Sequence, residues 1–472
     1  MEPLTVKENA GENKDSFRDH IATIRNDGKR NYIHPLKPKG RLYRLRSITS
    51  TVYLVVFLLL PFIKHDGEPL FLFNILERKF ILFGVIFWPT DFIIFGIGMI
   101  TFIVFIVLFT VVFGRVFCGW ACPQTILMEM VFRKIEYFFE GDSNEQIRLA
   151  KMNWNAEKIR KRGMKLFVFA IISFILANFF LSYIIGMNEI LDIYRAGTST
   201  SGSLTAVIIF AGIFFGLFSW FREQACLIVC PYGRLQGVLL DRNSIVVAYD
   251  YQRGEPRGHI SKKEKEKQLG DCVDCSLCVK VCPTGIDIRN GTQMECVNCT
   301  ACIDACDEVM EKVHRPKGLI RYASEEGIKN KQPLTITRRI KAYSFVLALL
   351  VGVLVFLLAT RSDIDATVLR AGGQLFEERP GDSICNLYTV SVINKTRKDM
   401  PLSFRLDSND GTIQMVGKPV VVPKEGKAES ELFIIKPKST LTSRKTKVKV
   451  SVYSGNKLIQ TVSTNFLGPI SR

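Results

Sequence analysis

The sequence predicts a multi-domain membrane protein built around an α-helical bundle of about five transmembrane helices. Three features lead to this prediction: five apolar runs, a cysteine-rich segment between the fourth and fifth runs, and alternating apolar and polar residues after the last run. The cysteine spacing is typical of a bacterial-type two-cluster ferredoxin, inserted here between two helices. The alternation at the end predicts a C-terminal β-sandwich, with which an Ig-like topology is compatible.

Length and charge set the broad class of protein. A chain of 472 residues is too long for a single domain. Hydrophobic residues make up 47% of it, and they gather in blocks near the roughly 20 residues that a bilayer span needs. A net charge of +18 can indicate nucleic-acid binding, but the basic residues here flank the apolar blocks and are typical of membrane anchors. The expected partner is therefore membrane lipid, not nucleic acid.

Five segments have the length and composition of transmembrane helices. They are Ile48–Ile63, Phe92–Phe113, Leu166–Met187, Leu204–Phe221 and Ala342–Thr360. Two further apolar stretches, Leu70–Phe73 and Phe80–Trp88, are too short to cross. We expect them to lie at the membrane interface or to re-enter the membrane.

Loop charge predicts how these spans are oriented. Residues 115–165 carry ten Lys and Arg residues, whereas the loop 188–203 carries only Arg195. The segment before the first span is also basic, through Lys37, Lys39, Arg41, Arg44 and Arg46. We therefore expect the N-terminus and the cysteine-rich insert to be cytoplasmic and the C-terminal domain to be extracytoplasmic.

These features divide the chain into five predicted parts. They are a cytoplasmic N-terminal tail (1–46), a four-helix membrane domain (47–240), a dicluster ferredoxin domain (241–335), a fifth transmembrane helix (341–360) and an extracytoplasmic β-domain (361–472). In the last part, strands are expected around Leu387–Ile393, Glu431–Ile435 and Val448–Tyr453.

Eight cysteines carry the spacing of two 4Fe–4S clusters. The runs are Cys272-x2-Cys275-x2-Cys278-x3-Cys282-Pro283 and Cys296-x2-Cys299-x2-Cys302-x3-Cys306. In such runs the first three thiolates bind one cluster and the fourth binds the neighbouring cluster. One predicted ligand set is therefore Cys272, Cys275, Cys278 and Cys306, and the other is Cys296, Cys299, Cys302 and Cys282. Zinc is the alternative, but a zinc ribbon uses two separated cysteine pairs per metal.

Four more cysteines form an internal repeat. Cys118-x3-Cys122-Pro123 follows the second span, and Cys226-x3-Cys230-Pro231 follows the fourth. A spacing of four places both sulfurs on one helix face, within reach of one metal or of each other. Two copies together allow one four-cysteine site. The alternative is that these cysteines are small core residues, since free cysteine is often buried for packing.

The surroundings of the repeat favour a redox or metal role. A proline ends helical geometry at the preceding cysteine and suits the first turn of a new helix, so Cys122 and Cys230 are expected near helix N-termini that favour thiolate. Four arginines could strengthen this effect: Arg115, Arg133, Arg222 and Arg234. Soft thiolates suit Cu(I), with Met128 and Met130 as candidate thioether ligands.

Other cofactor classes lack their residues. None of the five histidines lies in the middle of a span, which excludes a bis-histidine haem across the membrane, and there is no phosphate-loop or dinucleotide fingerprint. The thirteenth cysteine, Cys385, stands alone. Electrons are therefore expected from a soluble donor or a quinol.

The combined order of motifs resembles the cytochrome c oxidase accessory protein family (CcoG, also called RdxA or FixG). The resemblance rests on Cys118-Gly-Trp-Ala-Cys122-Pro-Gln, on Cys226-Leu-Ile-Val-Cys230-Pro-Tyr-Gly-Arg, and on the two cluster runs between the fourth and fifth spans. It implies a bacterial cytoplasmic-membrane protein that helps to mature a haem–copper oxidase by reducing Cu(II) to Cu(I). It also implies an Ig-like outer domain, and partners among oxidase subunits or copper-delivery proteins.

Three functions remain open from the sequence. The leading hypothesis is an oxidoreductase of the cupric reductase type, with two 4Fe–4S clusters and copper at its catalytic cysteines Cys118, Cys122, Cys226 and Cys230. The second is a quinol-linked electron relay like the membrane ferredoxins of periplasmic nitrate or nitrous oxide respiration. The third is a non-enzymatic copper-holding assembly scaffold.

Overall fold

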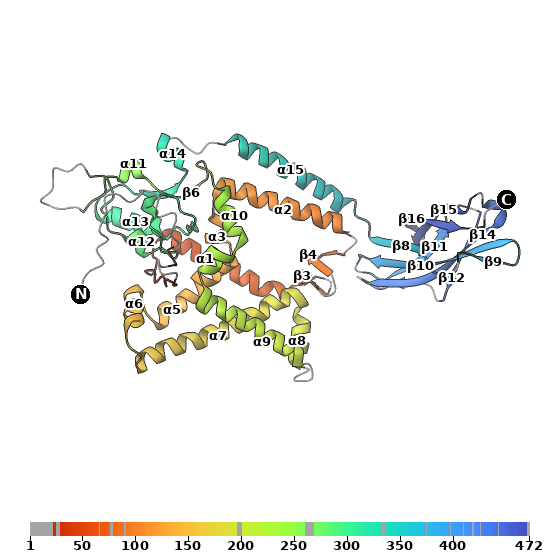
Figure 1. Ribbon diagram of the computed structural model, residues 1–472, viewed down its shortest axis with the longest axis horizontal. Coiled ribbons are helices and arrows are strands. Elements are labelled where there is room, and N and C mark those ends of the chain that lie inside the picture. The colour runs from red at the N-terminus through yellow and green to blue at the C-terminus, as the bar shows by residue number, and fades with distance from the viewer. Residues whose placement is uncertain are drawn as a thin grey trace. The chain divides into compact units, whose positions relative to one another are not determined.

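The computed structural model describes residues 22–469 except 25–28, 66, 76–78, 89–90, 196–200, 260–268, 332–335, 374, 397, 409, 418–419, 425 and 442. It forms two compact units. The first unit comprises Met1–Phe62 and Ile100–Leu349, and the second comprises Ile63–Met99 and Leu350–Arg472. Figure 1 labels many of the helices and strands of both.

Five helices are long and apolar enough to cross a membrane, as the sequence predicts. They are α1 (Arg41–Leu59, continued by a 3₁₀ turn to Phe62), α2 (Phe92–Phe113), α7 (Ala156–Ile185), α9 (Ser201–Gly216, continued by a π-helical turn to Phe221) and α15 (Arg338–Ala359). At most 28% of any apolar window is buried within the protein. Apolar surface of this length belongs in lipid, so the chain is a multi-pass membrane protein.

The third membrane helix begins well before the predicted Leu166. Asn155 caps α7, since its side-chain oxygen accepts a hydrogen bond from the Lys158 N–H at 2.9 Å. The added turns are polar and are supported by an ion pair between Glu157 and Lys161 at 2.9 Å. A search for apolar runs alone cannot detect these turns.

Short helices connect the spans within the first unit. They are α3 (Val116–Trp120), α4 (Pro123–Ile126), α5 (Arg133–Phe139), α6 (Ser143–Lys151), α8 (Met187–Arg195) and α10 (Pro231–Leu239), with a π-helical segment (Leu127–Phe132) joining α4 to α5. Phe132 of that segment packs between Phe169 of α7 and Phe218 after α9, with ring centroids 4.8 and 4.3 Å apart. α7 and α9 lie side by side (Figure 1). This packing brings the segments that follow the second and fourth spans together.

The cysteine-rich insert belongs to the same compact unit as the membrane helices. It contains an antiparallel pair of strands, β6 (Val246–Tyr249) and β7 (Ile320–Ala323), and helices α11 (Tyr251–Gly254), α12 (Leu277–Lys280), α13 (Ala301–Lys312) and α14 (Glu325–Asn330). The Asp304 carboxylate of α13 accepts hydrogen bonds from the backbone N–H groups of Leu42 (3.1 Å) and Tyr43 (2.7 Å). A carboxylate thus caps α1, and this cap joins the first membrane helix to the insert.

The second unit holds two sheets from the end of the chain. One has the order β12-β14-β10-β8, with β9 beside β10, and the other has the order β13-β11-β15-β16. The strands are β8 (Ile364–Arg370), β9 (Glu377–Arg379), β10 (Ser383–Asn394), β11 (Met400–Leu406), β12 (Thr412–Val416), β13 (Val420–Val422), β14 (Lys427–Pro437), β15 (Lys445–Ser454) and β16 (Lys457–Leu467). All three predicted strand segments are confirmed, within β10, β14 and β15.

The alternation of those strands builds the core of the domain. In β10, Tyr388, Val390 and Val392 are buried, and in β14 Leu432 and Ile434 are buried. The registers Tyr388↔Leu432 and Asn386↔Ile434 place these apolar side chains on one face. The lone Cys385 is buried here and is far along the chain from the other cysteines.

The short apolar stretches between the first two spans form strands. They are β3 (Phe71–Asn74), β4 (Lys79–Leu82) and β5 (Val85–Phe87), which pair antiparallel, and a small hairpin of β1 (Lys64–His65) and β2 (Glu68–Pro69) precedes them. Leu72, Ile81 and Ile86 form their core. Their place at a membrane interface stays a prediction.

Asp91 joins this small sheet to the start of the β-domain. Its carboxylate lies 2.7 Å from Lys395 Nζ and 2.6 Å from Arg361 Nη2, and it is 5% exposed. Burial alone would raise the pKa of Asp91, but the hydrogen bonds from Lys395 and Arg361 outweigh it and hold the pKa below its ordinary value. The ion pair therefore stabilises the unit while Asp91 is ionised.

Asp91→Asn is expected to destabilise the second unit by about 3 kcal/mol, because two buried cations lose their counter-charge. Because the pKa of Asp91 is lowered, the contribution is complete above the ordinary carboxyl pKa and is lost as the pH falls through the folded-state value. Thermal unfolding of the full chain in detergent, at pH 7 and at acid pH, measures both effects. Asp365→Asn is the matched control, since its carboxylate lies 3.8 Å from Lys395 and is more exposed. Equal loss in both variants would contradict the assignment.

Candidate iron–sulfur and thiol site

Two cavities in the insert are lined by the two predicted ligand sets. One cavity, of about 350 Å³, is lined by Cys272, Cys275, Cys278 and Cys306, which we call the first cluster site. The other, also of about 350 Å³, is lined by Cys282, Cys296, Cys299 and Cys302, which we call the second cluster site. Cys278 lines both cavities, so the two sites are neighbours. Cys282 of the first run lines the second cluster site, and Cys306 of the second run lines the first cluster site, as the spacing predicts.

The backbone of both cysteine loops has the same unusual conformation. Asp274 and Ser276 in the first run have φ of 50° and 55°, and Asn298 and Thr300 at the matching places in the second run have φ of 52° and 67°. Left-handed residues alternating with others turn successive N–H groups toward a concave surface, as in many iron–sulfur sites. The repeated geometry fits two clusters of the same kind.

The residue types of the two sites suit iron–sulfur clusters, because each cavity is lined by one complete set of four cysteines from the dicluster spacing. Burial raises the pKa of Cys278, Cys296 and Cys306 to about 12, so binding must displace their protons.

Asp307 has a structural role at the place where the first run has proline. Its carboxylate accepts a hydrogen bond from the Gly318 N–H at 2.8 Å, and Gly318 has a φ of +80°. This bond fixes the turn that leads into β7. The fourth cysteine, Cys306, keeps its place in the first cluster site.

The two Cys-x3-Cys-Pro motifs fold in the same way. The N–H of Cys122 donates to the Phe117 carbonyl at 2.9 Å, and that of Cys230 donates to the Ala225 carbonyl at 2.8 Å, so each pair closes a wide turn over five residues. The turn is wider than the α-helical one that the spacing predicts, and such π-type turns recur at functional sites. The internal repeat is thereby present in the backbone.

Proline places the second cysteine of each pair at a helix start, as expected. Cys122 precedes α4 and Cys230 precedes α10, each with extended backbone geometry and with proline at the first helical position. Gly114 lies four residues before Cys118, and Arg222 lies four residues before Cys226. Both have a positive φ, of 55° and 49°. The same break therefore separates each membrane helix from its thiol motif.

The four thiols of the two motifs lie close enough to influence one another, and we call them the thiol site. Burial raises the pKa of Cys118 to about 11, against the opposing charge of Arg115, and Cys122 and Cys230 add to the rise. Burial raises the pKa of Cys226 to about 12, with further contributions from Cys122, Cys118 and Cys230. The single four-cysteine site that two copies would allow stays a prediction, since no three His, Cys, Asp or Glu side chains of the described residues lie close enough together to hold one ion.

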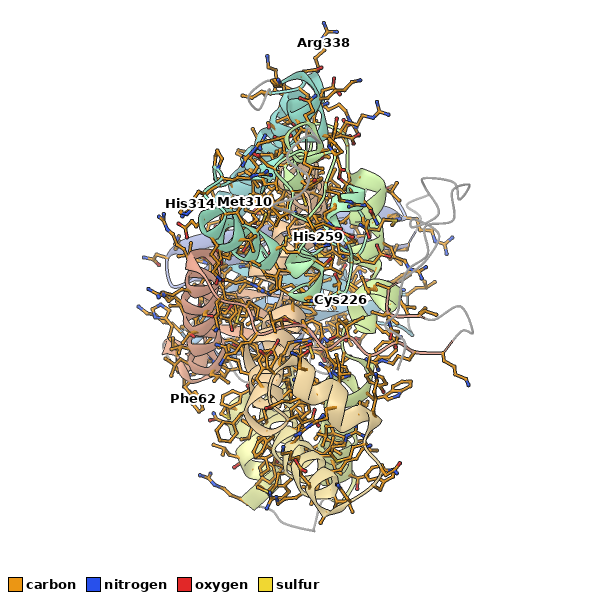
Figure 2. All side chains as sticks on the ribbon, turned by 90° about the vertical axis from the view of Figure 1, so that its left-hand side faces the viewer. Phe62, Cys226, His259, Met310, His314 and Arg338 are labelled. Atoms are coloured by element: carbon orange, nitrogen blue, oxygen red, sulfur yellow. The ribbon has the colours of Figure 1, made fainter. Side chains whose placement is uncertain are left out.

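A cavity of about 380 Å³ lies between the thiol site and the second cluster site. Its lining includes Cys226 and Met128 from the thiol segments and Pro283, Thr284 and Val297 from the insert. The last three residues also line the second cluster cavity. Figure 2 labels Cys226 among the side chains of this region. One wall of three residues therefore separates the thiol that lines this cavity from the second cluster site.

The two candidate thioethers differ in their surroundings. Met128 lines the cavity that contains Cys226. Met130 is buried, and its sulfur accepts a hydrogen bond from the Ser47 hydroxyl at 3.7 Å. Only Met128 is thus placed near a thiol of the described site.

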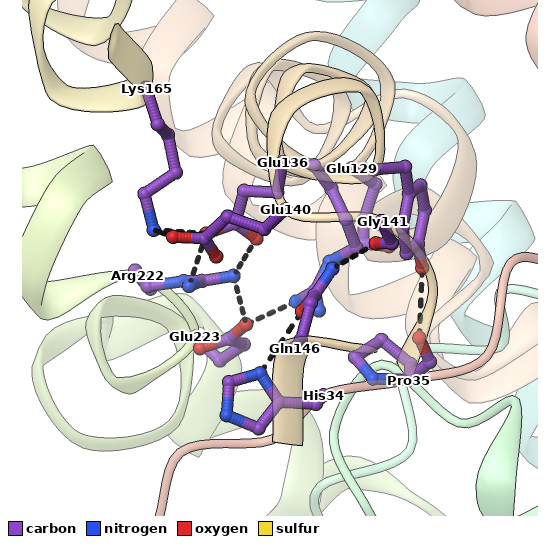
Figure 3. Close-up of polar contacts among 12 residues, drawn as sticks. His34, Pro35, Glu129, Glu136, Glu140, Gly141, Gln146, Lys165, Arg222 and Glu223 are labelled. Carbon is purple, nitrogen blue, oxygen red and sulfur yellow. Dashed lines mark hydrogen bonds and ion pairs between the residues drawn. The ribbon is translucent and has the colours of Figure 1, made fainter. Parts of the chain in front are cut away.

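Two of the four arginines expected beside the thiols are instead paired with glutamates. Arg222 makes two hydrogen bonds to Glu136, of 2.8 and 2.7 Å, and Arg133 pairs with Glu129 at 2.9 Å and with Glu223. The pairs belong to a buried network that includes Lys165 and Glu140, 2.8 Å apart (Figure 3). Buried guanidinium groups require such partners. Glu129 is four residues from Arg133, a spacing that a sequence reveals, whereas Glu223 and Glu136 lie 90 and 86 residues from their arginines and no local pattern reveals them. Of the four, only Arg115 acts on a thiol, and Arg234 is exposed.

One residue of the site could not be identified from the sequence. Gln236 of α10 is fully buried, and its side-chain oxygen accepts hydrogen bonds from Cys118 Sγ at 3.0 Å and from Arg115 Nε at 3.1 Å. It links a cysteine of the first repeat to the helix after the second.

Comparisons with known proteins agree with this architecture. Residues 221–325 match the family described as a 4Fe-4S dicluster domain, residues 95–140 match a 4Fe-4S binding domain, and residues 354–469 match the Ig-like fold at the C-terminus of FixG, a candidate oxidoreductase. Protein RdxA of Cereibacter sphaeroides is 35% identical over 400 residues, which cover 80% of this chain and 83% of that protein. Protein RdxB of the same organism is 34% identical, covering 87% of this chain and 90% of that protein.

The chain belongs to the FixG/RdxA/RdxB family. The nitrogen fixation protein FixG of Rhizobium meliloti is a further relative, 39% identical over 311 residues, which cover 63% of this chain and 58% of that protein. A solved FixG-related protein from Vibrio parahaemolyticus covers 23% of this chain and 97% of its own, with 21% identity and a TM-score of 0.20. This member of the family is a multi-pass membrane protein with 4Fe–4S binding domains and an Ig-like C-terminal domain. The family resemblance stated from the motifs is confirmed.

Cys275→Ser is expected to lower the iron and acid-labile sulfide content of the purified protein by about half, because the first cluster site loses one of four ligands. Anaerobic purification with iron, sulfide and zinc analysis measures this. Cys385→Ser removes a buried thiol of the β-domain and should leave the iron content unchanged. Stoichiometric zinc without sulfide in the wild-type protein would overturn the cluster assignment.

Proposed function

We propose that this protein is an electron-transferring cupric reductase that supports maturation of a haem–copper cytochrome c oxidase. The observation that carries the proposal is the wall formed by Pro283, Thr284 and Val297. It lines both the second cluster cavity and the cavity that contains Cys226. Such an arrangement suits electron exchange between a buried redox centre and a metal ion at the thiols.

In this proposal Cu(II) is the substrate, and the thiol site binds it. One electron from a cytosolic one-electron donor converts each Cu(II) to Cu(I). Thiolates and a thioether favour the softer product ion, which suits Cys118, Cys226 and the nearby Met128. Because burial raises the pKa of Cys118 and Cys226, copper binding releases protons from these thiols.

The insert supplies the route by which electrons reach the thiols. Bound at the two cysteine sets, 4Fe–4S clusters would supply reversible one-electron chemistry. Of the thirteen cysteines, all of which the structure describes, only Cys275 is exposed, which suits the first cluster site as the entry side for a soluble donor. Cys278 lines both cluster cavities, so the entry side adjoins the second site.

Loop charge supports the direction of this route across the membrane. The basic segment before the first span and the basic segment 115–165, compared with the single Arg195 in 188–203, favour a cytoplasmic insert, where thiols stay reduced and soluble donors are present. The Ig-like domain would then be extracytoplasmic, available to an oxidase subunit or a copper-delivery protein. The inner membrane of a bacterium is the expected location.

A copper-holding scaffold and a quinol-linked relay make different predictions. In a scaffold, copper binds but the clusters do not change their redox state when Cu(II) is added. In a relay, a quinol analogue reduces the clusters and copper is not needed. The mixing experiment below distinguishes them.

The dithionite-reduced protein, desalted and mixed with Cu(II), is expected to form Cu(I) in step with reoxidation of its clusters. Stopped-flow absorbance with a Cu(I)-specific chelator measures both. The double variant Cys118→Ala, Cys226→Ala should retain its iron but lower the rate at least tenfold, because copper loses its thiol ligands. Cys385→Ala, which removes a thiol elsewhere, should behave as wild type. An unchanged rate in the double variant would refute the thiol site as the place of reduction.

A further inference from the structure

Arg46 stands apart from the other basic residues at the start of the first span. It is 2% exposed, whereas Arg41 and Arg44 on the same helix are exposed. Its Nε donates a hydrogen bond to the Gly119 carbonyl at 2.7 Å, and Gly119 directly follows Cys118. From its place before the first span, Arg46 is expected to be a membrane anchor. Its burial excludes that role, because an anchor must reach the lipid head groups.

Gly119 also connects Arg46 to the second cluster site. A side chain at Gly119 would collide with the Val297 carbonyl and with the backbone of Asn298, so these backbones lie in direct contact. Val297 and Asn298 immediately precede Cys299. Cys118 and Cys299 belong to the same buried apolar cluster. The Arg46 side chain therefore ends where the thiol motif meets the second cysteine loop.

One guanidinium nitrogen of Arg46 is left without a protein partner. Nη2 is buried and makes no hydrogen bond to the described residues. A buried, unpartnered cation is strongly unfavourable unless an anion faces it.

We propose that Arg46 is a positioning residue that supplies a fixed positive charge to the second cluster site and joins the first membrane helix to the thiol motif. Thiolates and inorganic sulfide bound at that site would be the negatively charged partners that Nη2 lacks. A cation in a low-dielectric site favours the more negative, reduced state, so Arg46 raises the midpoint potential of that site. The inference does not depend on copper as the substrate.

Three variants of the full-length protein in detergent test this assignment. Arg46→Gln removes the charge, Arg46→Lys keeps it, and Arg44→Gln removes a charge from the exposed side of the same helix. EPR-monitored redox titration under anaerobic conditions gives the potential of each cluster, and iron and sulfide analysis gives the cluster content. Cys275→Ser identifies the signal of the first cluster site.

Arg46→Gln is expected to lower the potential of the second site by at least 59 mV, a tenfold change in its one-electron reduction equilibrium. The first site should keep its potential, and Arg44→Gln should change neither. Arg46→Lys should stay closer to wild type than Arg46→Gln. Loss of the second cluster in Arg46→Gln but not in Arg46→Lys would also support a role for the positive charge. Unchanged potentials in Arg46→Gln would overturn the proposal. Equal shifts or equal cluster loss in both Arg46 variants would also overturn it, because packing of the side chain would then explain the effect of either substitution without its charge.

Discussion

The close contact between Gly119 and the loop before Cys299 is the constraint on which the site depends. Because Gly119 has no side chain, the Val297 carbonyl can approach its backbone, and Cys118 then packs in one apolar cluster with Cys299. Gly233 has a similar role after the second motif, since a side chain there would lie 2.7 Å from the Cys226 carbonyl. Glycine in each repeat thus lets polar backbone approach closely at the membrane edge.

A buried ionic network holds the two repeats in register around this contact. Glu136, on the helix after the first thiol motif, pairs with Arg222 at the start of the second, and Glu223 pairs with Arg133 in return. Such pairs contribute little net stability, because desolvation offsets their attraction. They do specify geometry, since separating any pair leaves a buried charge uncompensated. The network therefore explains how two weakly similar segments can present their cysteines to one site.

The sequence predicts much of this architecture because its strongest signals are local. Apolar length predicted the five spans, cysteine spacing predicted which four cysteines line each cavity together, and proline predicted the helix starts at Cys122 and Cys230. Strand alternation predicted three strands of the Ig-like domain. The polar turns at the start of α7 were missed because they carry no apolar pattern.

Long-range polar contacts could not be predicted in this way. Arg46 has the same sequence surroundings as the exposed Arg44, yet only Arg46 reaches the Gly119 carbonyl. Arg133 and Arg222 were expected beside the thiols, but Arg133 pairs with Glu223 and Arg222 with Glu136, 90 and 86 residues away in the sequence. Gln236 likewise meets Cys118 only after two repeats have folded together. The partners of a buried polar group are set by tertiary packing, which spacing within one motif does not encode.

The central claim is that the cluster sites and the thiol site act as one connected site, and Gly119→Ala tests it most directly. The added methyl group should separate the thiol motif from the Val297 carbonyl while all twelve cysteines remain. The account predicts wild-type iron content but at least a tenfold slower reoxidation of the reduced clusters by Cu(II). Gly163→Ala, in an open position on α7, should react at the wild-type rate. A Gly119→Ala protein with intact clusters and the wild-type rate would contradict the account.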